Sequence, residues 1–221
     1  MAPQSTIEMQ TCSAPPIEGE GEGGASPGSG VSGLNSLNLI NGYSGTVTVV
    51  APLGVGTFNL TAGPTGAIAQ PSTPSGNDIT VTGTFTWTGG VLNNTPSNAY
   101  VNIKGGGTIT LPGTGNTLTS GSTLVFASLG GIQVTTITGA GTLLLNGTNE
   151  DAIFVRADAK VQLPVQEGSD GAVKGVDNVN KKLTIEAGAF WGYVGSGTGE
   201  LGLQVGNNGG RFYLTVQRGF R

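Results

Sequence analysis

The hydrophobic residues of this chain fall into short runs of the β type. Early examples are the runs 46–50, 79–81 and 84–87, in which threonine alternates with valine, isoleucine, phenylalanine or tryptophan. Glycine, proline, asparagine or serine bounds each run, as turns bound strands. No segment has a convincing helical period, and the best candidate, 152–160, is interpreted equally well as a strand and a turn. The pattern predicts an all-β protein.

A nine-residue unit then recurs along the chain. It has an apolar residue, two spacers, a small or polar turn residue, two more spacers, and an apolar-x-apolar end. Copies begin at Ile103, Leu118, Ile137, Val155 and Ile185, with a shortened copy at Val81. The five full copies start 15, 19, 18 and 30 residues apart. The average, about 20 residues, is close to one coil of a parallel β-solenoid.

Stacked coils would bury the apolar positions of the unit in one column. The side chains expected to point inward are Ile103, Ile109, Leu111, Ile137, Leu143 and Leu145. The central turn residue, Gly106 in one copy and Asp158 in another, is expected at positive φ, where the chain bends between two strands.

The chain divides by composition into two parts. Residues 1–45 form a tail rich in glycine, proline and glutamate, in which the apolar segment 31–40 is a candidate joining strand. Residues 46–221 form the predicted β-solenoid domain. A β-sandwich or jelly roll is the alternative, because short strands with glycine-rich turns also suit that class, particularly in the last third.

The repeat unit resembles a known group of bacterial surface proteins. Segments 107–111 (GTITL), 183–189 (LTIEAGA) and 86–90 (TWTGG) are similar to the degenerate repeats of autotransporter passengers and other large β-helix surface proteins. The resemblance covers residues 79–193. It implies a right-handed parallel β-helix at the cell surface or outside the cell, used for adhesion, matrix or surface coating. No outer-membrane barrel is recognisable at the C-terminus, and the chain is short for a passenger.

Charge and chemistry argue for a scaffold. The net charge of −4 disfavours nucleic-acid partners, and no apolar run is long enough to span a membrane. The adjacent pair Lys181–Lys182 is interpreted as a solvated turn. The chain has no histidine, the commonest general base, and its few carboxylates have no spacing that would pair them. We therefore expect no enzyme, no catalytic residue and no cofactor. Ca²⁺ bound by oxygen atoms near 149–151 or at Asp170 is the exception kept open.

Two further features are candidate contact sites. Phe190, Trp191 and Tyr193 cluster in the sequence and are either core or end packing, or a contact for glycan or for another subunit. Cys12 is the only cysteine, so it is either an incidental thiol or a crosslink to a second chain.

Three functions remain as alternatives. The first is a structural subunit of an extracellular bacterial fibre, sheath or surface layer, whose partners are copies of itself or other surface components. The second is a cell-surface adhesin or carbohydrate-binding β-helix. The third is a polysaccharide-acting β-helix enzyme or phage tailspike.

Overall fold

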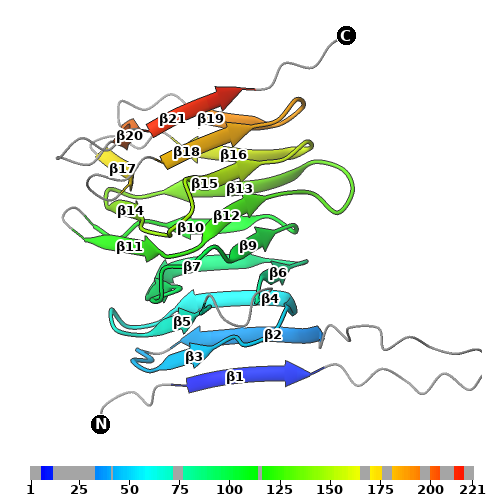
Figure 1. Cartoon of the computed structure of the whole chain (residues 1–221), viewed down its shortest axis with the longest axis vertical. Helices are drawn as coiled ribbons and strands as arrows, with labels where there is room; N and C mark the ends of the chain where they lie inside the picture. Colours follow the sequence, from blue (N-terminus) through cyan, green and yellow to red (C-terminus); the bar gives the residue numbers. More distant parts are fainter. Residues whose placement is uncertain are drawn as a thin grey trace, which may run out of the picture.

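The computed structural model of the protein is a column of stacked strands (Figure 1). It describes the backbone of residues 6–11, 33–40, 42–71, 77–113, 116–164, 170–175, 181–194, 200–204 and 212–216. Side chains are described for 34–40, 42–71, 77–113, 116–163 and 181–192. Every regular element in these segments is a strand, which confirms the prediction of an all-β protein.

The strands form three parallel ladders that run along the column. The first ladder contains β4 (Leu53–Thr61), β7 (Phe85–Gly89), β10 (Gly107–Thr110), β13 (Gln133–Thr138), β16 (Ala159–Pro164) and β19 (Phe190–Val194). The second contains β3 (Thr46–Thr48), β5 (Ala67–Ala69), β8 (Val91–Leu92), β11 (Thr117–Ser120), β14 (Thr142–Leu145), β17 (Asp170–Gly175) and β20 (Glu200–Gln204). The third contains β6 (Ile79–Val81), β9 (Tyr100–Ile103), β12 (Thr123–Phe126), β15 (Asp151–Val155), β18 (Lys181–Ile185) and β21 (Phe212–Val216). The beginning of β4 also pairs with β6, so β4 joins the first and third ladders.

Each coil visits the ladders in the same order. The chain passes from β7 through β8 and β9 to β10, which returns beside β7 in parallel register. The parallel pairing continues to the end of the described chain, where β15 pairs with β18 and β18 with β21. The fold is therefore a parallel β-solenoid as predicted, and the sandwich alternative does not apply.

Two strands precede this regular stack. β2 (Gly33–Ile40) lies parallel to β4, so it forms a rung of the column. β1 (Thr6–Thr11) pairs with the other edge of β2 in the antiparallel direction. The described part of the candidate joining strand 31–40 thus pairs on both sides within its own chain.

The nine-residue unit describes a corner of the coil and not a whole coil. Phe126 pairs with both Ile103 and Val155, and Val155 pairs with Ile185, so these residues end equivalent strands of the third ladder. The copies that begin at Leu118 and Ile137 lie at the other two corners. Successive coils measured at the third ladder take 23, 29 and 30 residues. The predicted coil length of about 20 residues was too short. All three corners have the same alternation of inward and outward residues, so the unit recurs at each of them, and the spacing between its copies does not measure a whole coil.

The corner between the third and first ladders has a distinctive backbone. Gly106, Asp158 and Gly188 occupy equivalent positions in it, with φ of +77°, +62° and +83°. These angles confirm the expectation for Gly106 and Asp158, since glycine and aspartate tolerate the left-handed region better than most residues.

The core is one continuous column of apolar side chains from Leu37 to Leu183. It includes all six residues predicted to point inward, each at most 2% exposed. Three of the largest buried side chains meet between β4 and β7, where the ring centroids of Phe58 and Phe85 are 5.6 Å apart and those of Phe85 and Trp87 are 6.4 Å apart. The described part of the column is therefore held by a single hydrophobic core.

A buried polar network lies at the corner between the second and third ladders. Asn93 is fully buried with φ of +63°. Its Oδ1 accepts hydrogen bonds from the backbone N–H of Gln70 and Thr95, at 2.8 and 3.1 Å. Its Nδ2 donates to the hydroxyl oxygens of Ser97 and Ser122, each at 2.9 Å. Ser122 in turn donates to Gln70 Oε1 at 2.8 Å, so the network joins three consecutive coils.

Candidate functional site

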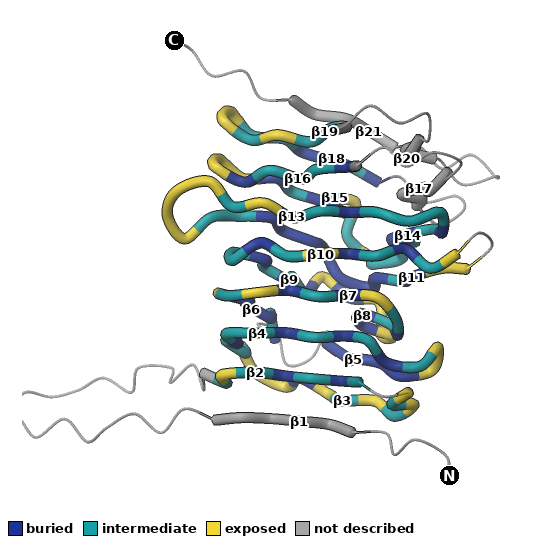
Figure 2. The backbone as a smooth tube through the Cα atoms, turned by 180° about the vertical axis from the view of Figure 1, so that it is seen from behind, coloured by how far each residue is buried: buried dark blue, intermediate teal, exposed yellow. Residues whose placement is uncertain are grey.

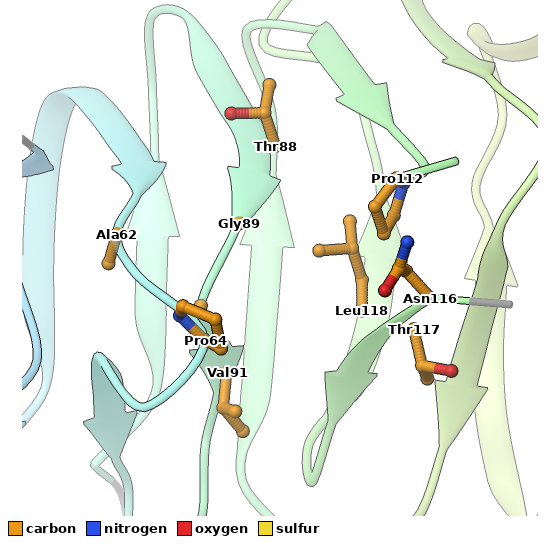
Figure 3. Close-up of a pocket in the computed structure, with 10 residues that line it drawn as sticks. Ala62, Pro64, Thr88, Gly89, Val91, Pro112, Asn116, Thr117 and Leu118 are labelled. Atoms are coloured by element: carbon orange, nitrogen blue, oxygen red, sulfur yellow. The ribbon is translucent and has the colours of Figure 1, made fainter. Parts of the chain in front are cut away.

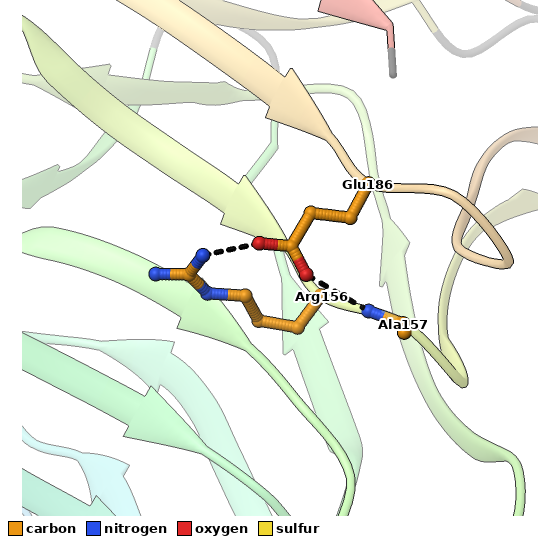
Figure 4. A network of polar contacts seen from close by, with 3 residues as sticks. All are labelled: Arg156, Ala157 and Glu186. Atoms are coloured by element: carbon orange, nitrogen blue, oxygen red, sulfur yellow. Dashed lines mark hydrogen bonds and ion pairs between the residues drawn. The ribbon is translucent and has the colours of Figure 1, made fainter. Parts of the chain in front are cut away.

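Two carboxylates, Asp151 and Glu186, pair with cations of adjacent rungs. The guanidinium of Arg156, after β15, donates to Glu186, after β18 (Figure 4). Glu186 also accepts from the backbone N–H of Ala157 at 3.2 Å, and the Arg156 guanidinium carbon lies 4.6 Å from the ring centroid of Phe154. Lys182 Nζ lies 3.2 Å from a carboxylate oxygen of Asp151. These partly exposed pairs are each worth up to about 1 kcal/mol and link neighbouring rungs.

The calcium hypothesis concerns the loop before β15 and Asp170. In that loop Asn149 Oδ1 already accepts the backbone N–H of Asp151 at 3.1 Å, and the side chain of Asp170 lies outside the described residues. Within the described side chains, no three histidine, cysteine, aspartate or glutamate residues gather as metal ligands. The calcium site stays a prediction.

Lys181 was interpreted from the sequence as part of a solvated turn, and the structure corrects this. Its side chain, in β18, is only 1% exposed. Its ammonium group donates to the backbone carbonyl oxygens of Gly147, at 2.5 Å, and Asn149, at 3.0 Å. Burial lowers the pKa of this ammonium below 10.5, while the charge of Glu150 opposes the shift. Lys181 thus holds the loop before β15 against the next coil.

This burial gives Lys181 a pH-dependent effect on stability. A lysine whose pKa is lower in the folded state binds its proton more weakly there, so its contribution to the free energy of unfolding increases as the pH rises from the folded pKa toward 10.5. We expect the free energy of unfolding of the wild type, minus that of Lys181→Met, to increase between neutral pH and pH 10.5. Urea unfolding of both proteins across this range measures it. A difference that stays constant or decreases contradicts the assignment.

Two of the sequence-predicted contact residues, Phe190 and Trp191, differ in exposure. Phe190 is 38% exposed, whereas Trp191 is partly buried and packs against the core. They are neighbours in β19, so their side chains point to opposite faces of the strand. The side chain of Tyr193 and all of Cys12 lie outside the described residues.

Comparisons with protein-family models, curated proteins and solved structures find no match for this chain. Among the elements that the structure describes, no helix is long and apolar enough to cross a membrane.

A surface notch lies at the corner between the first and second ladders (Figure 3). Its volume is about 280 Å³. Gly90 alone separates β7 from β8, whereas longer connections leave β4 before it and β10 after it. The short corner is the floor of the notch, and the neighbouring connections, with Pro64 on one side and Pro112 on the other, are its walls.

Glycine is required at the floor of this notch. Gly90 has φ of +77°, and a Cβ atom there would lie 2.7 Å from the carbonyl oxygen of Gly66. The rim carries the uncharged polar side chains of Thr88, Asn116 and Thr117, and no lining residue is charged. The notch can therefore accept an uncharged, mainly apolar group without leaving a buried charge unpaired. Sequence reasoning missed it because it arises from a difference in length between successive corners.

Proposed function

We propose that this chain is a non-enzymatic structural subunit of an extracellular bacterial fibre, sheath or surface layer. The supporting observation is the one-sided pairing of the strands at the end of the described column. β19, β20 and β21 are the last strands of the three ladders, and each pairs on one side only within the described residues. Unpaired strand edges are templates for further strands, and under this proposal strands of another subunit continue the three ladders.

The two ends of the described column differ. At the other end β1 lies antiparallel on the edge of β2, and β3 is the first strand of the second ladder. Contact between unlike ends is heterologous, and repeated heterologous contact produces an open filament unless the rotation closes a ring. Head-to-tail stacking of columns is the assembly that this arrangement favours.

The bacterial and extracellular parts of the proposal rest on the resemblance of the repeat to autotransporter passengers. Segments 107–111 and 183–189, which carry the resemblance, are strands or turns of the solenoid corners, and this supports its β-helix part. The proposal extends this resemblance to function: the chain serves as a scaffold at the cell surface, as a passenger does.

The proposal predicts concentration-dependent assembly through β21. We expect the full chain to form rods that lengthen with concentration, seen by electron microscopy and sedimentation velocity. Val216→Pro should shorten the rods. Alternate residues of a parallel strand bond to opposite neighbours, and the register of β15, β18 and β21 directs the N–H of Val216 to the free edge. Proline removes this donor, and its ring obstructs an added strand.

The matched control is Val216→Ala, which leaves the backbone donor in place and should assemble like the wild type. Circular dichroism checks that both variants keep the fold. A wild-type protein that stays a single compact species at all concentrations contradicts the proposal, and so do Val216→Pro rods of unchanged length.

A further inference from the structure

One corner of the solenoid carries an exposed apolar loop. β12 ends at Phe126 and β13 begins at Gln133, whereas the equivalent corner between β15 and β16 spans only 156–158. Leu129 and Ile132 in this longer loop are 58% and 60% exposed. Val134, at the start of β13, continues the apolar surface at 38% exposure.

The loop has a defined shape despite its exposure. The Ser128 hydroxyl donates to the carbonyl oxygen of Gly131 and accepts from the backbone N–H of Gly130 at 3.0 Å. Gly131 supplies the positive φ, +70°, that closes the turn. This ordered loop therefore exposes two large apolar side chains, Leu129 and Ile132, only three positions apart in the sequence, and exposed apolar surface of this kind marks interaction sites more often than isolated apolar side chains do.

The loop and the notch complement each other in chemistry and size. The loop segment 127–132 has no charged residue, and neither has the lining of the notch. A buried cavity of about 150 Å³ accepts a benzene ring. The notch, at about 280 Å³, has room for the aliphatic side chains of the loop tip.

Their positions exclude contact within one chain. Figure 2 shows the exposed loop that enters β13 at one edge of the column and the turns that leave β4 and β7 at the opposite edge. The first ladder runs between the two edges. A second column placed side by side with the first can bring its loop to this notch.

We infer that the loop tip, Leu129 and Ile132, inserts into the notch around Gly90 of a second copy of this chain, so that columns associate laterally. The inference deepens the proposed function and rests on it. The loop and the notch are different surfaces, so two copies in contact still have one unused loop and one unused notch between them. Further copies can bind there, and the contact extends into a sheet or bundle. The notch lies level with β7 and the loop with β13, two rungs further along the first ladder. Neighbouring columns are therefore offset by about 10 Å, at ~4.8 Å per rung.

The test separates lateral from end-to-end association in the full chain. The wild type should form bundles or sheets of rods by electron microscopy. Leu129→Asp/Ile132→Asp should form single rods, because the charged tip cannot enter an uncharged notch. Thr88→Trp, which fills the notch from its exposed rim, should do the same. Val50→Asp is the matched control, since Val50 is equally exposed, at 60%, but lies between β3 and β4, and it should bundle normally.

A mixture of the two variants gives the decisive result. One variant keeps its notch and the other keeps its loop, so mixing them should produce paired rods and nothing wider. Bundling by either variant alone, or single rods in the mixture, overturns the loop-to-notch contact. Wild-type rods that never associate sideways overturn this contact and leave the proposed function standing. A wild type that forms no rods overturns both.

Discussion

Replacing Trp87 with alanine is expected to lower the free energy of unfolding by about 3–5 kcal/mol, the range for large aromatic side chains deleted from a core. Trp87 is fully buried, and its indole N–H donates to the carbonyl oxygen of Gly90 at 3.4 Å. In register it lies between Leu60 of the preceding rung and Ile109 of the following one. The cavity would therefore open inside the column, where two neighbouring rungs lose contacts at once.

Urea unfolding measures the Trp87→Ala effect, and Thr88→Ala is the control on the same strand. Thr88 is exposed, so its substitution should change stability by no more than about 0.5 kcal/mol. A loss of stability in Trp87→Ala as small as that of the control would mean that Trp87 does not support the core.

The second large effect is expected at Asn93. Asn93→Leu removes one amide from a buried network and leaves the N–H groups of Gln70 and Thr95 without their acceptor. An unsatisfied buried N–H, such as that of Gln70, costs about 1–3 kcal/mol, and a leucine at positive φ costs ~1–2 kcal/mol more, so we expect a total loss of about 2–5 kcal/mol. Chemical denaturation, followed by circular dichroism, measures the loss.

Two variants separate the contributions at Asn93. Asn93→Gly deletes the amide but tolerates the backbone angle of +63°, so it should be less destabilising than Asn93→Leu. Asn94→Ala removes the exposed neighbouring amide and should be nearly neutral. Equal stability of Asn93→Leu and Asn94→Ala would contradict the assigned network.

The fold class was predictable because the alternation of the nine-residue unit is a local property. The inward direction of residues such as Ile103, Ile109 and Leu111 follows from their spacing in the sequence alone. The length of the coil was not predictable in this way. All three corners use similar alternation, so the spacing between copies such as those at Leu118 and Ile137 does not reveal which corner each one occupies.

Buried polar residues were missed for a related reason. Asn93 and Lys181 have the residue types of solvated turns, and nothing beside them in the sequence indicates burial. Their partners are distant, since Asn93 bonds to Gln70 and Ser122, 23 and 29 residues away, and Lys181 to Gly147, 34 residues away. Such networks form between residues that lie side by side on neighbouring rungs. Which residues these are depends on the lengths of all the corners between them.

The parallel ladders also determine how the column would respond to force. The strands run across the column, so the backbone hydrogen bonds between them point along its axis. Tension along the axis would pull on these bonds one rung at a time, as in unzipping, whereas compression would press the packed rungs together. Sideways shear between adjacent rungs would load all the hydrogen bonds of that interface at once. A surface built from such columns would therefore resist crushing better than stretching, unless lateral contacts between columns shared the tension.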